Sequence, residues 1–232
     1  MTQLLISVTS VEEARLALTH GADLIDLKNP ADGALGALPN AVVEEVAAYV
    51  HAASPHNADH DVILVSATIG DLPMQADVIV SRVSALAKTG VDIVKIGFFA
   101  ASDYSPCLTA LMPLTANGQK IIAVLFAEYS YPTVLLAQIK AAGFYGVMMD
   151  TAHKNGRTLL DNLTETQLQD FARQASDSKL FYGLAGSLNI QHVAKVLAFS
   201  PDYVGFRGGV SENNQRARGL NADKITAIRK LL

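Results

Sequence analysis

Residues 21–28 read GADLIDLK, and this stretch decides the fold that the sequence predicts. Its frame returns as GVDIVKIG at residues 90–97 and as SPDYVGFR at residues 200–207. Residues 143–150 follow it more loosely. Each copy is a short, mainly apolar run that follows turn-forming residues, a pattern typical of a parallel β-strand covered on both faces. The repeat therefore predicts four equivalent strands.

Similar apolar runs alternate with amphipathic helical patterns along the whole chain. The expected strands are Leu4–Val8, Leu24–Lys28, Val62–Ser66, Ile93–Gly97, Ile121–Phe126, Gly146–Asp150, Leu180–Leu184 and Tyr203–Arg207. The expected helices are Val11–Thr19, Ala41–His51, Pro73–Lys88, Ser105–Asn117, Pro132–Ala142, Glu165–Ser176, Ile190–Phe199 and Asp223–Leu232, of which Ser105–Asn117 has the least helix-like pattern.

Eight strand–helix units without an intervening linker predict a single-domain α/β protein, a closed (β/α)8 TIM barrel over residues 1–232. A doubly wound open sheet is the alternative. That fold usually carries a glycine-rich dinucleotide motif after its first strand, whereas residues 7–10 read SVTS.

Composition narrows the class of protein. The 232 residues are 50% hydrophobic, 17% charged and carry a formal net charge of -4, so neither disorder nor nucleic-acid binding is expected. The single cysteine, Cys107, suits a reducing cytoplasm and a buried position. The first residues lack a basic leader, and no apolar run is long enough to span a membrane. We expect a cytoplasmic protein, and a homo-oligomer remains possible.

The repeat also aligns charged residues. In its frame Asp26 corresponds to Lys95, and Lys28 corresponds to both Asp150 and Arg207. Side chains from alternate strands fill a barrel in layers, and barrel active sites lie at the carboxyl ends of the strands. We therefore expect Asp26 and Lys95 in one layer, with Lys28, Asp150 and Arg207 one layer nearer that end.

Each of these residues has a structural alternative. Asp26 and Lys95 could form an ion pair that only supports the barrel, and Lys28 could reach solvent. However, a buried ion pair adds little net stability, because desolvation offsets most of the Coulomb attraction. Two lysines and two aspartates that converge from three strands therefore favour a catalytic site.

Two neighbouring lysines suit Schiff-base chemistry on a carbonyl substrate. A lysine must lose its proton before it attacks, so its ordinary pKa of about 10.4 must fall toward 7. A second ammonium about 5 Å away supplies about 3 kcal/mol of the 4–5 kcal/mol that this shift requires, and partial burial supplies the rest. The carboxylates then serve better as proton shuttles than as permanent counter-ions.

The loops after the last two expected strands favour a phosphate. They contain Gly183–Ser187 and Phe206–Gly209, and barrels commonly bind phosphate with these two loops. The expected contacts are Gly186, Ser187, Arg207, Gly208 and Gly209. Turn glycines without a ligand are the alternative.

Lys154 and the histidines are further candidates for a functional site. Lys154 follows Asp150 on the loop after the sixth strand and is either a solvated charge or an acid–base partner. The histidines form no convincing metal motif, including His51, His56 and His60 around the hydrophilic connection at residues 54–61. We expect no metal and no cofactor other than a covalent lysine intermediate.

These motifs resemble the (5-formylfuran-3-yl)methyl phosphate synthase family. The resemblance rests on residues 4–7, DLKNP at 26–30 and GALG at 33–36, and it continues through VKIG at 94–97, DTAHKNG at 150–156, LAGSL at 184–188 and FRGG at 206–209. It spans nearly the whole chain.

Membership of that family implies a specific reaction. Its members are barrels that condense two glyceraldehyde 3-phosphate molecules into a furan aldehyde phosphate, an early step toward methanofuran-type cofactors. The resemblance makes Lys28 the Schiff-base lysine, with Asp26, Lys95, Asp150 and Lys154 as its acid–base partners. Triose phosphates are then the expected small-molecule partners. The alternatives are a class I sugar-phosphate aldolase and a non-catalytic phosphosugar-binding barrel.

Overall fold

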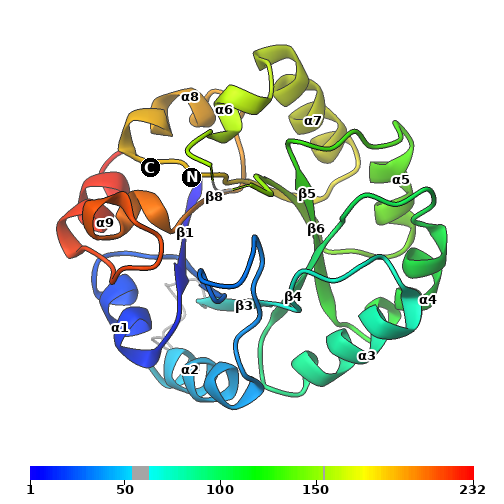
Figure 1. Ribbon diagram of the computed structural model, residues 1–232, viewed down its shortest axis with the longest axis horizontal. Helices are drawn as coiled ribbons and strands as arrows, with labels where there is room; N and C mark the ends of the chain where they lie inside the picture. Colours follow the sequence, from blue (N-terminus) through cyan, green and yellow to red (C-terminus); the bar gives the residue numbers. More distant parts are fainter. Residues whose placement is uncertain (54–62, 154) are drawn as a thin grey trace.

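The eight strands close into one parallel barrel, and the helices surround it (Figure 1). The computed structural model describes residues 1–53, 63–153 and 155–232. The strands are β1 Gln3–Val8, β2 Leu24–Leu27, β3 Leu64–Thr68, β4 Ile93–Gly97, β5 Lys120–Phe126, β6 Gly146–Asp150, β7 Phe181–Leu184 and β8 Tyr203–Phe206. Each strand pairs with the next in the chain, and β8 pairs with β1. The predicted (β/α)8 TIM barrel is confirmed.

Helices follow the strands on the outside of the barrel. The α-helices are α1 Val11–Thr19, α2 Asn40–Ala53, α3 Ala76–Ala87, α4 Ser105–Ala116, α5 Leu135–Ala141, α6 Leu159–Asn162, α7 Glu165–Asp177, α8 Val193–Leu197 and α9 Ala222–Arg229, and the short 3₁₀ helices are η1 Ile190–His192, η2 Gly208–Val210 and η3 Glu212–Asn214. Among the described parts of the chain, none of these helices has the length and apolar character needed to cross a membrane.

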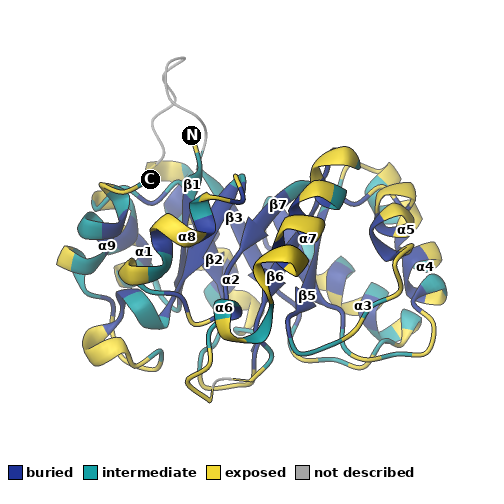
Figure 2. Ribbon diagram, turned by 90° about the horizontal axis from the view of Figure 1, so that it is seen from above, coloured by how far each residue is buried: buried dark blue, intermediate teal, exposed yellow. Residues whose placement is uncertain are grey.

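Apolar side chains form two separate buried clusters. The larger one packs the outward-facing strand residues, such as Ile6 and Val94, against the helices. The smaller one fills the barrel interior and includes Leu24, Ile93 and Tyr203. Figure 2 shows the strands mostly buried and the helices exposed on their outer faces. Inward and outward positions alternate along each strand, which places Asp26 inside the barrel between Leu24 and Lys28.

Several element boundaries differ from the predicted ones. Strand β3 begins at Leu64, and its pairing with β2 and β4 sets its register. Val62, the first residue of the predicted strand, and the connection at 54–61 lie outside the described residues. Helix α3 begins at Ala76 because the Gln75 amide bonds the Pro73 carbonyl in a preceding turn.

The glycine-rich segment after β2 folds back across the end of the barrel. Asn29 and Gly36 form an antiparallel bridge, and Leu35 is buried in the interior cluster. The Asp71 carboxylate accepts the amide hydrogens of Ala34 and Leu35, each at 2.8 Å. The loop is therefore fixed beside Lys28, where it covers part of the barrel interior.

Candidate active site

Asp26 is the centre of a buried polar network inside the barrel. Its Oδ1 accepts hydrogen bonds from Lys95 Nζ and Ser66 Oγ, both at 2.8 Å. Its Oδ2 accepts one from Ser7 Oγ at 2.9 Å. The predicted placement of Asp26 and Lys95 side by side in the barrel interior is therefore confirmed, and each residue is only 1% exposed.

The two lysines keep the Asp26 carboxylate ionised. Burial raises its pKa, but attraction to Lys95 and Lys28, together with hydrogen bonds from Lys95 and Ser66, outweighs burial and holds the pKa below its ordinary value. The carboxylate and the Lys95 ammonium thus form a charged pair at the base of the site.

This pair should make the barrel less stable in acid. A folded-state pKa below the unfolded value of about 3.9 means that the Asp26 carboxylate stabilises the fold above about pH 4 and loses this contribution as the pH falls through the folded value. We expect the difference in unfolding free energy between wild type and Asp26→Asn, measured with urea, to shrink from pH 7 to about pH 3. A difference that stays constant over this range would contradict the ionised pair.

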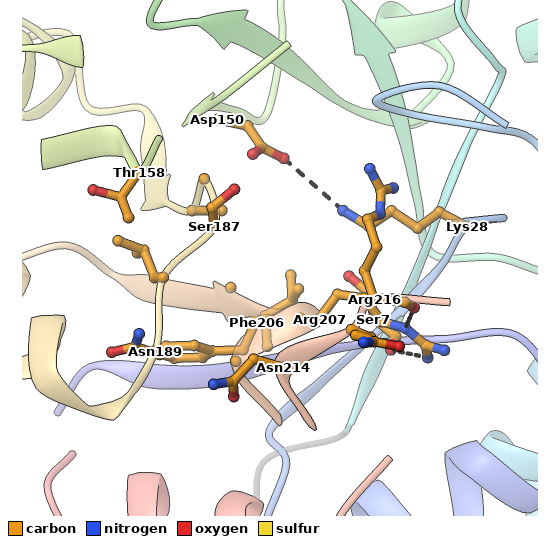
Figure 3. Close-up of a pocket in the computed structure, with 18 of the residues that line it drawn as sticks. Ser7, Lys28, Asp150, Thr158, Ser187, Asn189, Phe206, Arg207, Asn214 and Arg216 are labelled. Atoms are coloured by element: carbon orange, nitrogen blue, oxygen red, sulfur yellow. Dashed lines mark hydrogen bonds and ion pairs between the residues drawn. The ribbon is translucent and has the colours of Figure 1, made fainter. Parts of the chain in front are cut away.

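Lys28 and Asp150 lie one layer nearer the carboxyl ends of the strands. Lys28 Nζ is 3.9 Å from Asp150 Oδ2, and their side chains are 9% and 3% exposed. The Asp150 carboxylate is oriented by the Thr151 amide, which donates to Oδ1 at 2.7 Å. Both side chains line a cavity of about 520 Å³, and Figure 3 shows them facing each other across it. A volume of this size is typical of small-molecule sites, which occupy about 300–1,000 Å³.

The loops after β7 and β8 form another wall of the same cavity. Gly186 and Ser187 come from the first loop, and Gly208 and Gly209 come from the second. Gly186 has φ +106°, a conformation that glycine adopts without strain. A Cβ atom at Gly209 would lie 2.2 Å from the Leu188 carbonyl oxygen, so only glycine lets the two loops approach this closely. Glycine loops at the carboxyl ends of barrel strands let backbone N–H groups approach a ligand closely, which suits an anion.

Arg207 lines the cavity but donates its hydrogen bonds to the protein. Its guanidinium forms a two-point ion pair with Glu13 of α1, at 2.5 and 3.1 Å. The other N–H groups bond the carbonyl oxygens of Ser7, Arg216 and Arg218, at 3.1, 2.8 and 3.0 Å. All five donors are used, so the structure assigns Arg207 to holding the segment after β8; its predicted phosphate contact stays a prediction.

The structure brings together most of the predicted site residues. The cavity lining includes Lys28, Asp150, Gly186, Ser187, Arg207, Gly208 and Gly209. Asp26 and Lys95 lie one layer deeper, below the cavity. Lys154 lies outside the described residues.

Three supporting residues are not among the site residues expected from the sequence. Glu128, after β5, accepts the amide hydrogens of Ala152 and His153 at 2.8 and 3.0 Å, which fixes the loop that follows Asp150. Glu13 fixes Arg207, and Arg216 lines the cavity beside Lys28. Glu128 follows the end of β5, the position from which barrel loops reach the site, and this position is the signal in the sequence that points to it.

The described histidines do not suggest a metal centre. His51 Nε2 lies 3.0 Å from Asp92 Oδ2, while His56 and His60 lie outside the described residues. Within residues 1–53, 63–153 and 155–232, no group of three or more histidine, cysteine or acidic side chains is arranged to hold a metal ion.

Solved structures with a similar fold are barrels of distant sequence. Phosphoribosyl anthranilate isomerase from Thermococcus kodakaraensis matches with a TM-score of 0.66 at 16% identity, over 100% of this chain and 98% of its own. 3-Hexulose-6-phosphate synthase from Salmonella typhimurium matches with a TM-score of 0.63 at 14% identity, over 100% and 98%. At these identities the likeness concerns the fold alone.

Relatives in sequence are closer. A protein of Methylorubrum extorquens, provisionally named (5-formylfuran-3-yl)methyl phosphate synthase, is 37% identical over 96% of this chain and 88% of its own. The (5-formylfuran-3-yl)methyl phosphate synthase of Methanococcus maripaludis is 30% identical over 98% of both chains. That of Methanosarcina mazei is 30% identical over 99% of this chain and 95% of its own. The family model described as 4-HFC-P synthase matches residues 4–229. The chain therefore belongs to the 4-HFC-P synthase family.

Proposed function

We propose that this protein condenses two molecules of glyceraldehyde 3-phosphate into (5-formylfuran-3-yl)methyl phosphate through a Schiff base on Lys28. The observation that carries the proposal is the Lys28 amine in the cavity, 3.9 Å from Asp150 and next to the two glycine loops after β7 and β8. The sequence relatives carry the name of a synthase of this product, which supports the proposal. The proposed context of this reaction is the formation of methanofuran or an analogue.

Lys28 supplies the covalent chemistry. Its amine attacks a triose carbonyl, water leaves, and the resulting iminium makes the neighbouring carbon more acidic. Removal of a proton from that carbon gives an enamine-type nucleophile, which adds to the carbonyl of the second triose phosphate. No other cofactor is needed, because the iminium accepts the electron pair.

Asp150 is the best-placed group for proton transfer at this carbon. Its carboxylate faces the Lys28 amine across the cavity, and the Thr151 amide holds it there. Lys154 follows on the same loop and is proposed as a second acid–base group. Asp26 and Lys95 lie below and provide the charged pair that orients Lys28 and relays protons to it.

The reaction needs room for two phosphates, of which one is released. Two triose phosphates that lose one inorganic phosphate and two waters leave the atoms of the six-carbon furan monophosphate. Backbone N–H groups of the Gly186–Ser187 and Gly208–Gly209 segments suit the phosphate that is retained. Aromaticity of the furan then makes the last dehydration effectively irreversible.

Incubation with glyceraldehyde 3-phosphate alone tests the proposal. We expect an ultraviolet absorption band of the furan aldehyde and the release of one inorganic phosphate per product molecule. Carbon–carbon bond formation without phosphate release would instead indicate a class I aldolase. Substrate binding with neither product would indicate a phosphosugar-binding barrel, and either result would contradict the proposed reaction.

A further inference from the structure

Arg216 has an unused part of its guanidinium in the cavity. The residue lies in the segment between β8 and α9 and lines the cavity together with Lys28 and Asp150. Figure 3 shows its side chain extending toward Lys28, away from the Arg207 side chain. Its Nη2 atom is buried and has no hydrogen-bond partner among the residues that the structure describes.

A buried donor that lines a cavity is suited to bind a ligand with acceptor oxygens. An unsatisfied buried polar group costs about 1–3 kcal/mol, so such groups are rare in folded proteins. Burial lowers the pKa of Arg216, with the Asp150 charge acting against that effect, but an arginine keeps its positive charge at neutral pH. The cavity therefore presents a fixed cation with free N–H groups.

The backbone of Arg216 is held in place on both sides. Arg207 Nε donates to the Arg216 carbonyl and Arg207 Nη2 to the Arg218 carbonyl, at 2.8 and 3.0 Å. On the other side, Lys224 Nζ donates to the Ser211 carbonyl at 2.8 Å. The ion pair between Arg207 and Glu13 thus fixes the position from which Arg216 enters the cavity.

The Arg216 side chain is a candidate anion contact in addition to the backbone of the glycine loops. Gly186 and Gly209 line the cavity, and the Arg216 side chain extends toward Lys28 (Figure 3). A planar guanidinium binds phosphate oxygens in a two-point fork. Arg157, on the loop after β6, is exposed and donates to the Asp161 carbonyl.

We propose that Arg216 binds the phosphate that leaves during the reaction. This inference rests on the proposed function. A base removes a proton from the carbon next to the Lys28 iminium carbon, and the electron pair of that C–H bond expels the phosphate from the following carbon. The C–O bond breaks, the electron pair departs with the phosphate oxygen, and the iminium is restored, so no oxidant or reductant is required. The guanidinium stabilises the negative charge that develops on the departing phosphate.

Substitution of Arg216 separates this step from Schiff-base formation. In Arg216→Gln we expect borohydride trapping of glyceraldehyde 3-phosphate on Lys28 as in wild type, but phosphate release about 10²–10³-fold slower. Inorganic phosphate should also inhibit this variant more weakly than wild type. Arg216→Lys, which keeps the charge but loses the fork, should fall between the two and also tests the proposal if the glutamine variant folds poorly.

Arg218→Gln is the matched control. Arg218 lies two positions along the same segment, also accepts a bond from Arg207 through its carbonyl, and is exposed, with its side chain bonded to Gln215. Its phosphate release should match wild type. Phosphate release from Arg216→Gln at the wild-type rate would overturn the proposal for Arg216. A loss of both borohydride trapping and phosphate release in this variant would also overturn it. Absence of trapping in the wild-type protein would instead contradict the proposed function itself.

Discussion

Lys28→Arg is expected to fold normally and to lose turnover of glyceraldehyde 3-phosphate by roughly 10⁴–10⁶-fold. Arginine keeps the positive charge opposite Asp150, 3.9 Å from Lys28 in the wild-type protein, so the buried carboxylate retains a counter-ion. However, a guanidinium does not lose its proton in proteins and does not form a Schiff base. Circular dichroism and urea unfolding report the fold, while furan absorbance and phosphate release report the reaction.

The matched control for this experiment is Lys195→Arg. Lys195 is exposed on α8, away from the cavity lining. The same chemical change there should leave turnover at the wild-type value. If Lys28→Arg retained more than a few per cent of wild-type turnover, the covalent role of Lys28 would be wrong.

The second large effect is expected from the buried pair of Asp26 and Lys95. Asp26→Asn leaves the Lys95 ammonium buried without its counter-charge, and Lys95→Met does the same to the Asp26 carboxylate. Each single variant should lower the unfolding free energy by about 3–5 kcal/mol. For a chain of this length that corresponds to a Tm roughly 6–20 °C lower. In the double variant Asp26→Asn/Lys95→Met neither charge remains; the amide oxygen can accept from one of the hydroxyls of Ser7 and Ser66, and the amide NH2 group can donate to the other. The double variant should therefore recover most of the loss.

An exposed ion pair gives the comparison. Asp170 and Arg173 on α7 lie 3.2 Å apart, with side chains 56% and 60% exposed. The cycle of Asp170→Asn and Arg173→Met should show a coupling of only about 0–1 kcal/mol. Similar coupling in the two cycles would contradict the role of burial.

The double variant of the buried pair also tests the chemistry, because near-normal turnover in a folded Asp26→Asn/Lys95→Met protein would exclude an acid–base role for Lys95.

The sequence repeat predicted the inner part of the site because it contains the strand register. Residues two positions apart on a strand face the same side, so alignment of GADLIDLK with GVDIVKIG placed Asp26 in the layer of Lys95. The same frame placed Lys28 near Asp150. Both contacts are present in the structure, at 2.8 and 3.9 Å.

The repeat could not predict where long side chains point. It placed Arg207 in the correct strand position, but the partner that orients its guanidinium is Glu13, 194 residues away on a helix beside β1. A helix pattern shows which face is apolar, but it does not show which distant side chain a carboxylate on that helix will pair with. Arg216 lies in an irregular segment without periodicity, so only the folded chain shows that it enters the cavity.

The ends of strands and helices were also predicted less accurately than the elements themselves. The apolar run at residues 62–66 suggested a strand two residues earlier than β3, because hydrophobicity marks a buried segment without fixing its register. The predicted helix at residues 190–199 is divided into η1 and α8. Asn189 caps the first turn by accepting from the Gln191 amide, which closes a 3₁₀ turn before the α-helix begins at Val193.

The central claim is the covalent bond between Lys28 and a triose phosphate, and borohydride reduction followed by peptide mass mapping tests it most directly. The protein is incubated with glyceraldehyde 3-phosphate, reduced, digested and mapped, with Lys28→Arg treated in parallel. We predict one stable triose phosphate adduct on the peptide that contains Lys28, and no adduct in the variant. An unmodified Lys28 peptide in the wild-type protein, under conditions where the furan product still forms, would contradict the claim.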